Sequence, residues 1–237
     1  MKSAYRFVAP ESQCPYLADQ RWRLEYVEVV ELTSQEYLAL LNRGWRRFGY
    51  TLFRPVCSSC RACQPIRVPV ERFVPNRSQK RVVKANRNEV TMVVGAPVID
   101  DARVDLYARH HEYRTATRDW PAHEGRDVAA SLFHFLDSPT VVQEWAFYLA
   151  DELVGIMYID PLPEGFSGIY FFHAPEHKER ALGNYMCLSL IEEARRLKLP
   201  YVYLGYYVAG CISMEYKAAF KPNQVLGDDG AWHDFLT

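Results

Sequence analysis

Three cysteines stand two residues apart in the stretch RPVCSSCRACQP, at Cys57, Cys60 and Cys63. Thiols at this spacing can hold zinc or part of an iron-sulfur cluster. A ferredoxin-type run would place a fourth cysteine directly before a proline, but glutamine stands there in this chain. Cys14 could supply the fourth thiolate from elsewhere. Three interpretations stay open: an iron-sulfur cluster, a zinc site, or reduced cysteines that pack a turn-rich loop.

A second chemical feature is the positive charge of the segment 43–87. It contains twelve arginines and lysines against a single acid, Glu71, although the whole chain has a formal net charge of -1. Within it, SQKRVVKANRN predicts a short helix with a basic face and inward-facing valines. A solvated helix face is the alternative, but such faces usually mix both signs of charge. Single-sign charge favours contact with a polyanionic nucleic acid through Lys80, Arg81, Lys84 and Arg87.

The elements that must position these groups divide the chain into two units. Thr33 and Glu36 have the spacing of a capping box at the start of a short helix. Gly, Pro, Ser and Cys dominate the segment 49–75, which predicts short strands joined by turns. We therefore expect a small, loop-rich, cysteine-containing unit at 1–76 and a second domain at 77–237.

The second domain is predicted to be α+β with a mixed sheet. After helices at 102–118 and 128–136, the sequence WAFYLADELVGIMYID predicts a β-hairpin. A strand at 168–172, a long helix that ends near Pro200 and a strand at 201–204 then predict one parallel βαβ unit.

This order of elements resembles the core of the GNAT N-acyltransferase fold. The sequence RALGNY at 180–185 resembles the start of the central helix of that fold, where the superfamily holds the pyrophosphate of acyl-CoA. Tyr185 stands at a position that the superfamily pattern gives to glycine or alanine. A CoA-dependent N-acetyltransferase is therefore one alternative, and a non-enzymatic RNA-binding module is another.

Four longer stretches resemble the aminoacyl-tRNA-protein transferase family. They are CPYL at 14–17, LNRGWRRFGYTLFRPVCSSCRACQPIRV at 41–68, FVPNRSQKRVVKANRN at 73–88 and GNYMCLSLIEEARRLKLPYVYLGYYVAGCISMEYKAAFKP at 183–222. The compact length is most like the bacterial aspartate/glutamate leucyltransferase branch. The resemblance implies that an amino acid, leucine in that branch, moves from its tRNA to the N-terminal amine of proteins that begin with Asp or Glu. This is a step of the N-degron pathway of protein degradation.

The implied partners are aminoacyl-tRNA as co-substrate, proteins with an acidic N-terminus, and downstream N-degron machinery. No cofactor is required for the chemistry itself. An arginyl-tRNA-protein transferase is an alternative within the family, and its donor would need an acid such as Glu215. The first residues show no signal-peptide pattern, and no stretch approaches the roughly 18 apolar residues of a membrane helix. We therefore expect a cytoplasmic protein without membrane contact.

The reaction would need hydrogen-bond donors rather than a strong base. An α-amine has an unperturbed pKa of about 7.7–8.0, but the ester oxyanion and the departing ribose hydroxyl both need a donor. The candidate catalytic residues are Tyr206, Tyr207 and Lys217. Recognition of an acidic side chain needs a cation, and the donor amino acid needs a pocket. The candidate substrate-binding residues are Arg54, Arg67, Arg77, Arg81, Tyr203 and Tyr216.

Overall fold

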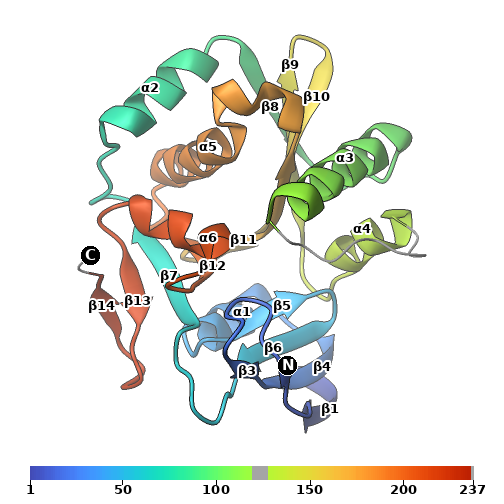
Figure 1. The fold of residues 1–237 in the computed structure, drawn as a ribbon, viewed down its shortest axis with the longest axis vertical. Helices are drawn as coiled ribbons and strands as arrows, with labels where there is room; N and C mark the ends of the chain where they lie inside the picture. Colours follow the sequence, from blue (N-terminus) through green and yellow to red (C-terminus); the bar gives the residue numbers. More distant parts are fainter. Residues whose placement is uncertain (119–127, 236–237) are drawn as a thin grey trace.

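The computed structural model describes residues 1–118 and 128–235 as a mixed α/β protein (Figure 1). Within these residues, the larger sheet has eight strands in the order β14-β13-β7-β12-β11-β10-β9-β8. The strands are β7 (Gln64–Pro69), β8 (Val90–Gly95), β9 (Gln143–Leu149), β10 (Glu152–Leu162), β11 (Gly165–His173), β12 (Tyr201–Tyr207), β13 (Gln224–Leu226) and β14 (Trp232–Asp234). The predicted mixed α/β class is confirmed.

The predicted hairpin and parallel βαβ unit are both present in this sheet. β9 and β10 pair antiparallel, and β10 pairs antiparallel with β11. α5 (Leu182–Arg196) then connects β11 to β12, which run parallel, with Ser167 opposite Tyr203. The apolar residues of α5 recur every three or four positions, and Met186, Leu190 and Ala194 are fully buried.

Helices cover both faces of the sheet (Figure 1). α3 (Asp101–Arg118) and α4 (Val128–Leu136) pack through Tyr107 and Phe135, whose rings contact Tyr170 of β11. α5 packs on the opposite face, where Met186 lies beside Gly155. α2 (Arg77–Asn86) contacts α5 from outside. The remaining turns of helix are η1 (Pro175–Arg180), α6 (Ile212–Glu215) and η2 (Tyr216–Ala219).

The N-terminal part of the chain forms a smaller sheet in the order β1-β4-β6-β5, with a two-stranded ribbon of β2 and β3 beside it. The elements are β1 (Lys2–Val8), β2 (Ser12–Gln13), β3 (Arg21–Trp22), β4 (Leu24–Glu31), α1 (Ser34–Leu41), β5 (Arg46–Phe48) and β6 (Thr51–Pro55). The predicted capping box is present, since Thr33 accepts from the Glu36 amide and Glu36 from the Thr33 amide. This unit therefore contains two long strands, β1 and β4, in addition to the predicted turns.

The two sheets share a second apolar core. Leu38, Leu41 and Leu52 of the smaller unit pack together with Leu162 and Tyr203 of the larger sheet. β7 also connects the two parts of the chain. It comes before residue 76, where the sequence predicts the domain boundary, but it lies between β12 and β13 in the larger sheet. Arg46 of β5 also donates hydrogen bonds to Ser167 and Gly168 of β11. In the two described ranges, no helix is both long and apolar enough to span a membrane.

Candidate functional site

A cleft of about 810 Å³ opens over the middle of the larger sheet. It is lined by the C-terminal half of α3 and by Gly168–Phe171 of β11. The segment that follows β12 contributes Gly210–Met214, Tyr216 and Lys217, and the N-terminal part of the chain contributes Cys14–Tyr16 and Ala18. A second hollow of about 330 Å³ shares His110, Arg114 and Tyr216 with it and reaches the start of α5. The two hollows therefore form one continuous groove, called the cleft below, that runs from the segment 14–18 to the N-terminus of α5.

The walls of the cleft are apolar and its polar groups are mainly cationic. Its apolar side chains include Ile169, Phe171, Leu204, Ile212 and Met214. Among the described residues that line the cleft and its extension, none is Asp or Glu. Its cations are Arg114, Arg118, Lys178 and Lys217. Such a surface suits an anionic ligand that carries a small apolar group.

Lys217 lies at the floor of the cleft. Its side chain is only 7% exposed. Its Nζ donates a hydrogen bond of 2.6 Å to the carbonyl oxygen of Tyr206 and lies 3.3 Å from Sδ of Met214. Burial, reinforced by the nearby charge of Arg46, lowers the pKa of Lys217 to about 7. The ammonium and the neutral amine are therefore both populated near neutral pH.

Arg46 is a site residue that the sequence did not single out beyond its place in the basic segment. It comes from β5 and is also 7% exposed. Its Nη1 donates to Oγ of Ser167 at 3.1 Å, and its Nη2 donates to the carbonyl oxygen of Gly168 at 2.5 Å. Both acceptors belong to β11, so the guanidinium lies under the edge of the cleft that Gly168 lines. No local pattern around Arg46 could have revealed this long-range contact.

The predicted tyrosines occupy different environments. The Tyr206 hydroxyl donates to the carbonyl oxygen of Gly44 at 2.7 Å, and burial raises its pKa. Tyr203 is 1% exposed within the core shared by the two sheets. Tyr207 packs against Phe235, outside the lining of the cleft. Tyr216 does line the cleft, and its side chain is 41% exposed there.

Two of the predicted arginines already have partners in the fold. Nε of Arg54 donates to Glu25 at 2.6 Å. The guanidinium of Arg67 lies 3.6 Å from the ring centroid of Tyr201 and 4.3 Å from that of Trp232. Neither arginine lines the cleft. Their role in substrate binding stays a prediction.

The basic face predicted on α2 points to solvent. Arg77, Lys80, Arg81, Lys84 and Arg87 are all exposed. The opposite face is fixed by two buried amides, because Gln79 donates to the carbonyl of Ala219 at 3.1 Å and Asn86 to that of Arg180 at 2.9 Å. The valines of α2 are partly buried, as the sequence predicts. α2 thus presents its cations outward from a rigid position beside the segment that carries Lys217.

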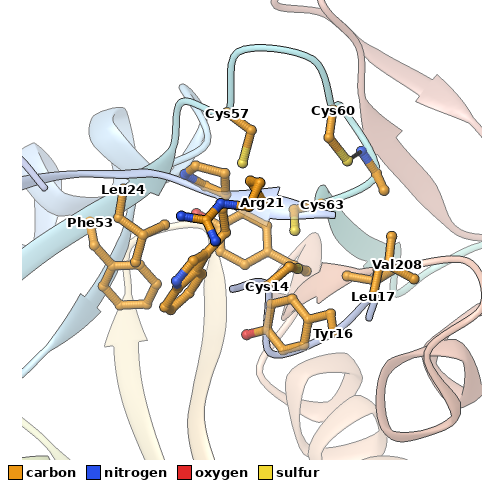
Figure 2. A pocket seen from close by; sticks show the side chains of 14 residues that line it. Cys14, Tyr16, Leu17, Arg21, Leu24, Phe53, Cys57, Cys60, Cys63 and Val208 are labelled. Atoms are coloured by element: carbon orange, nitrogen blue, oxygen red, sulfur yellow. Dashed lines mark hydrogen bonds between the residues drawn. The ribbon is translucent and has the colours of Figure 1, made fainter. Parts of the chain in front are cut away.

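The cysteines surround a small cavity between β6, β7 and the segment 14–17. Figure 2 shows Cys57 and Cys60 on the loop that leads to β7, with Cys63 and Cys14 below them in this view; Cys57 is the buried member of the four. The cavity has a volume of about 20 Å³, which is room for about one water molecule. Burial, with added repulsion from neighbouring cysteines, raises the pKa of Cys63 to about 12.

The thiols as they are arranged do not fit a metal centre. Among the described residues, no group of three or more His, Cys, Asp or Glu side chains is placed to hold a metal ion. All six cysteines are free. The predicted zinc or cluster ligands Cys14, Cys57, Cys60 and Cys63 all line the small cavity, and no step proposed below involves a metal.

His110 and His111 of α3 are both buried. His110 is 4% exposed, and its Nδ1 lies 2.9 Å from the carbonyl oxygen of His173. Burial, together with the neighbouring His173, lowers the pKa of His110 to about 3. The imidazole is therefore neutral at physiological pH and joins α3 to the end of β11 at the border of the cleft.

The fold and the cleft define a mixed α/β protein whose groove combines cationic side chains with an apolar lining. Comparison with known families is more specific. The model described as "Arginine-tRNA-protein transferase, C terminus" matches residues 102–227, and the corresponding N-terminal model matches residues 12–81. The chain belongs to the arginine-tRNA-protein transferase family. The resemblance found in the sequence is thereby confirmed.

Curated relatives extend over nearly the whole chain. An aspartate/glutamate leucyltransferase from Campylobacter jejuni is 34% identical over 93% of this chain and 92% of its own length. Proteins of the same name from Halorhodospira halophila and Pseudomonas putida are 35% and 36% identical, over 92% and 90% of this chain and 92% and 89% of theirs.

Solved structures are more distant. The structure of L-PGS from Bacillus licheniformis is 12% identical, with a TM-score of 0.46 over 77% of this chain and 53% of its own. The C-terminal domain of a putative lysylphosphatidylglycerol synthetase from Agrobacterium fabrum is 11% identical, with a TM-score of 0.49 over 71% and 61%. Likenesses at this level carry no argument about the site.

Proposed function

We propose that this chain transfers leucine from leucyl-tRNA to the N-terminal amine of proteins that begin with Asp or Glu. The observation that carries the proposal is the identity of 34–36% with aspartate/glutamate leucyltransferases over about nine tenths of the chain. Members of the family act on aminoacyl-tRNA and on acidic N-termini. The product carries a new N-terminal leucine, which downstream N-degron machinery would recognise.

The lining of the cleft supports leucine rather than arginine as the donor amino acid. Ile169, Phe171 and Leu204 offer an apolar surface to an uncharged side chain. An arginyl donor would need a carboxylate, and the described residues of the cleft contain none. Glu215 does not line the cleft, and its Oε1 accepts from the backbone amide of Gly210 at 2.7 Å. A cationic donor would therefore meet Lys217 without a compensating anion.

For the fold, we propose a GNAT-like transferase core in residues 77–237 that is completed by β7. The hairpin of β9 and β10, the parallel pair of β11 and β12, and the connecting α5 support it. Residues 1–76 would form the cysteine-containing unit that closes one end of the cleft through the segment 14–18. The donor and the acceptor would then share a single groove over the larger sheet, with the segment 14–18 at one end.

Recognition of the tRNA is assigned to α2. Lys80, Arg81, Lys84 and Arg87 project to solvent from a helix that is fixed on its other face. Exposed cations on a rigid element suit phosphate contacts, which together supply affinity that does not depend on base sequence. Gln79 of α2 donates a hydrogen bond to the carbonyl of Ala219, in the segment that carries Lys217. The aminoacyl end would then enter the cleft.

The reaction is proposed to be a direct displacement at the ester carbonyl. The nitrogen of the acceptor amine attacks the carbonyl carbon, a C–N bond forms, and the C–O bond to the ribose breaks. The proton lost by the attacking amine goes to the departing ribose oxygen. Of the predicted catalytic and substrate-binding residues, Lys217 and Tyr216 line the cleft and can donate hydrogen bonds there. Tyr206 supports Lys217 through its backbone carbonyl.

The test is a matrix of donors and acceptors. Purified protein is incubated separately with labelled Leu-tRNA, Arg-tRNA or acetyl-CoA, each with peptides that begin with Asp, Glu or Ala. We expect label from Leu-tRNA in the Asp and Glu peptides and not in the Ala peptide. Label from Arg-tRNA would change the donor, and label from acetyl-CoA would replace the reaction altogether.

A further inference from the structure

Two buried cations converge on one small space beside the cleft. Gly205 of β12 has φ +87°, in the left-handed region that favours glycine. A methyl group built on its Cα would lie 3.7 Å from Nζ of Lys217 and 3.8 Å from both Nε and Nη2 of Arg46. The absent side chain therefore leaves a gap that both cations border.

Neither cation has an anionic partner in the two described ranges of the chain. Arg46 donates to a hydroxyl and a carbonyl of β11, and Lys217 donates to the carbonyl of Tyr206. The buried carboxylate Asp160 is already paired with Arg47 at 2.5 Å. Burying two unpaired positive charges together is costly, because both lose hydration and each repels the other. A ligand with a full negative charge would relieve both costs.

We propose that Arg46 and Lys217 form the subsite that binds the side-chain carboxylate of the acceptor's N-terminal Asp or Glu. The inference rests on the proposed function and deepens it, because it assigns the residues that select acidic acceptors. It gives Lys217 the role of a recognition residue, so the oxyanion would be stabilised by another donor. The Tyr216 hydroxyl is the predicted donor that remains at the cleft.

The position of the subsite favours a carboxylate on a flexible stem over a tRNA phosphate. Both cations are 7% exposed, so a ligand group must leave water to reach them. A phosphate is joined on both sides to bulky nucleotides, while an Asp or Glu side chain ends in its carboxylate. That carboxylate is ionised at neutral pH, since its ordinary pKa is about 3.9 for Asp and 4.3 for Glu. Gly168 and Lys217 line the cleft, so the amine of the same residue would remain inside it.

The inference predicts a loss of selectivity rather than a uniform loss of rate. The measured quantity is the ratio of kcat/KM for a peptide beginning with Asp to that for the same peptide beginning with Asn. Arg46→Gln and Lys217→Met should each lower this ratio by roughly 10- to 100-fold, as expected for the loss of one hydrogen bond between charged groups. Arg46→Lys should retain most of the ratio. Arg43→Gln, an exposed arginine on the same segment, is the matched control and should leave the ratio unchanged.

Several outcomes would overturn the inference. An equal loss for Asp and Asn peptides would mean that the pair acts on the reaction centre or the fold. A raised KM for Leu-tRNA with an unchanged ratio would assign the pair to a phosphate. Folding of the variants does not limit the test, because the wild-type protein should also discriminate against a peptide whose Asp side chain is methyl-esterified. Equal use of that ester would contradict the inference, whereas no transfer to any peptide would instead refute the proposed function.

Discussion

Replacing Lys217 with Met should change how the stability of the protein depends on pH. In the unfolded chain the lysine keeps its ordinary pKa of 10.5, and in the native state burial lowers the pKa to about 7. Between these two values the unfolded state binds a proton that the native state has lost. The free energy of unfolding therefore rises with pH across this window, and below pH 7 the full cost of burying the ammonium is present.

The size of the effect follows from those two pKa values. From pH 6 to pH 8, titration of Lys217 should add about 1.4 kcal/mol to the free energy of unfolding. For a chain of this length that corresponds to roughly 3 to 6 °C in Tm. Lys217→Met lacks the titrating group, so its free energy of unfolding should rise relative to that of the wild type as the pH falls from 8 to 6. Other titrating groups act equally in both proteins and cancel in the comparison.

The assay is urea unfolding at pH 6, 7 and 8 for both proteins. Lys84→Met, which removes an exposed lysine from α2, serves as the control and should run parallel to the wild type. A difference between wild type and Lys217→Met that stays constant from pH 6 to pH 8 would refute the reasoning. It would mean that Lys217 does not titrate in this window, and that its environment is less desolvated than the structure indicates.

Two further variants test the buried ion pair of Arg47 with Asp160 and the proposed tRNA-binding face of α2. The side chain of Arg47 is fully buried and pairs with Asp160 at 2.5 Å, so Asp160→Ala leaves it without its anion. Urea unfolding should show that the free energy of unfolding falls by about 3–5 kcal/mol. A fall of less than about 1 kcal/mol would refute the importance of this ion pair. Reversal of the exposed charges of α2 to Glu should weaken tRNA binding and flatten its salt dependence in a titration series; unchanged affinity would remove α2 from the tRNA site. The residues to reverse are Lys80, Arg81 and Lys84.

Local patterns in the sequence were enough to predict many of the elements. The capping box at Thr33 and Glu36, the single-sign charge of α2 and the hydrophobic repeat of α5 each depend on residues within a few turns of one another. Such signals arise from backbone hydrogen bonding and amphipathic burial, so they can be recognised without the tertiary structure. The parallel βαβ unit followed because strand, helix and strand are consecutive.

The candidate site was harder to predict from the sequence, because its residues come from segments that are distant along the chain. Arg46 reaches β11 only because β5 packs against the larger sheet, and nothing in its neighbourhood of sequence distinguishes it from Arg43. Tyr206 shows the converse difficulty: its hydroxyl donates to the carbonyl of Gly44 inside the fold, and its catalytic role stays a prediction. A tyrosine or arginine side chain can line a binding pocket or pack in the core, and only its burial and its hydrogen-bond partners in the structure show which of these it does. β7 likewise joins the larger sheet through pairing with β12, which no periodicity could indicate.

The most direct test of the central claim is a competition for one acceptor. The protein is given Leu-tRNA, Arg-tRNA and acetyl-CoA together with a peptide that begins with Asp, and the product is identified by mass spectrometry with fragmentation. We predict a peptide that carries one added leucyl residue on its α-amine. A product that carries an arginyl or an acetyl group instead would contradict the account.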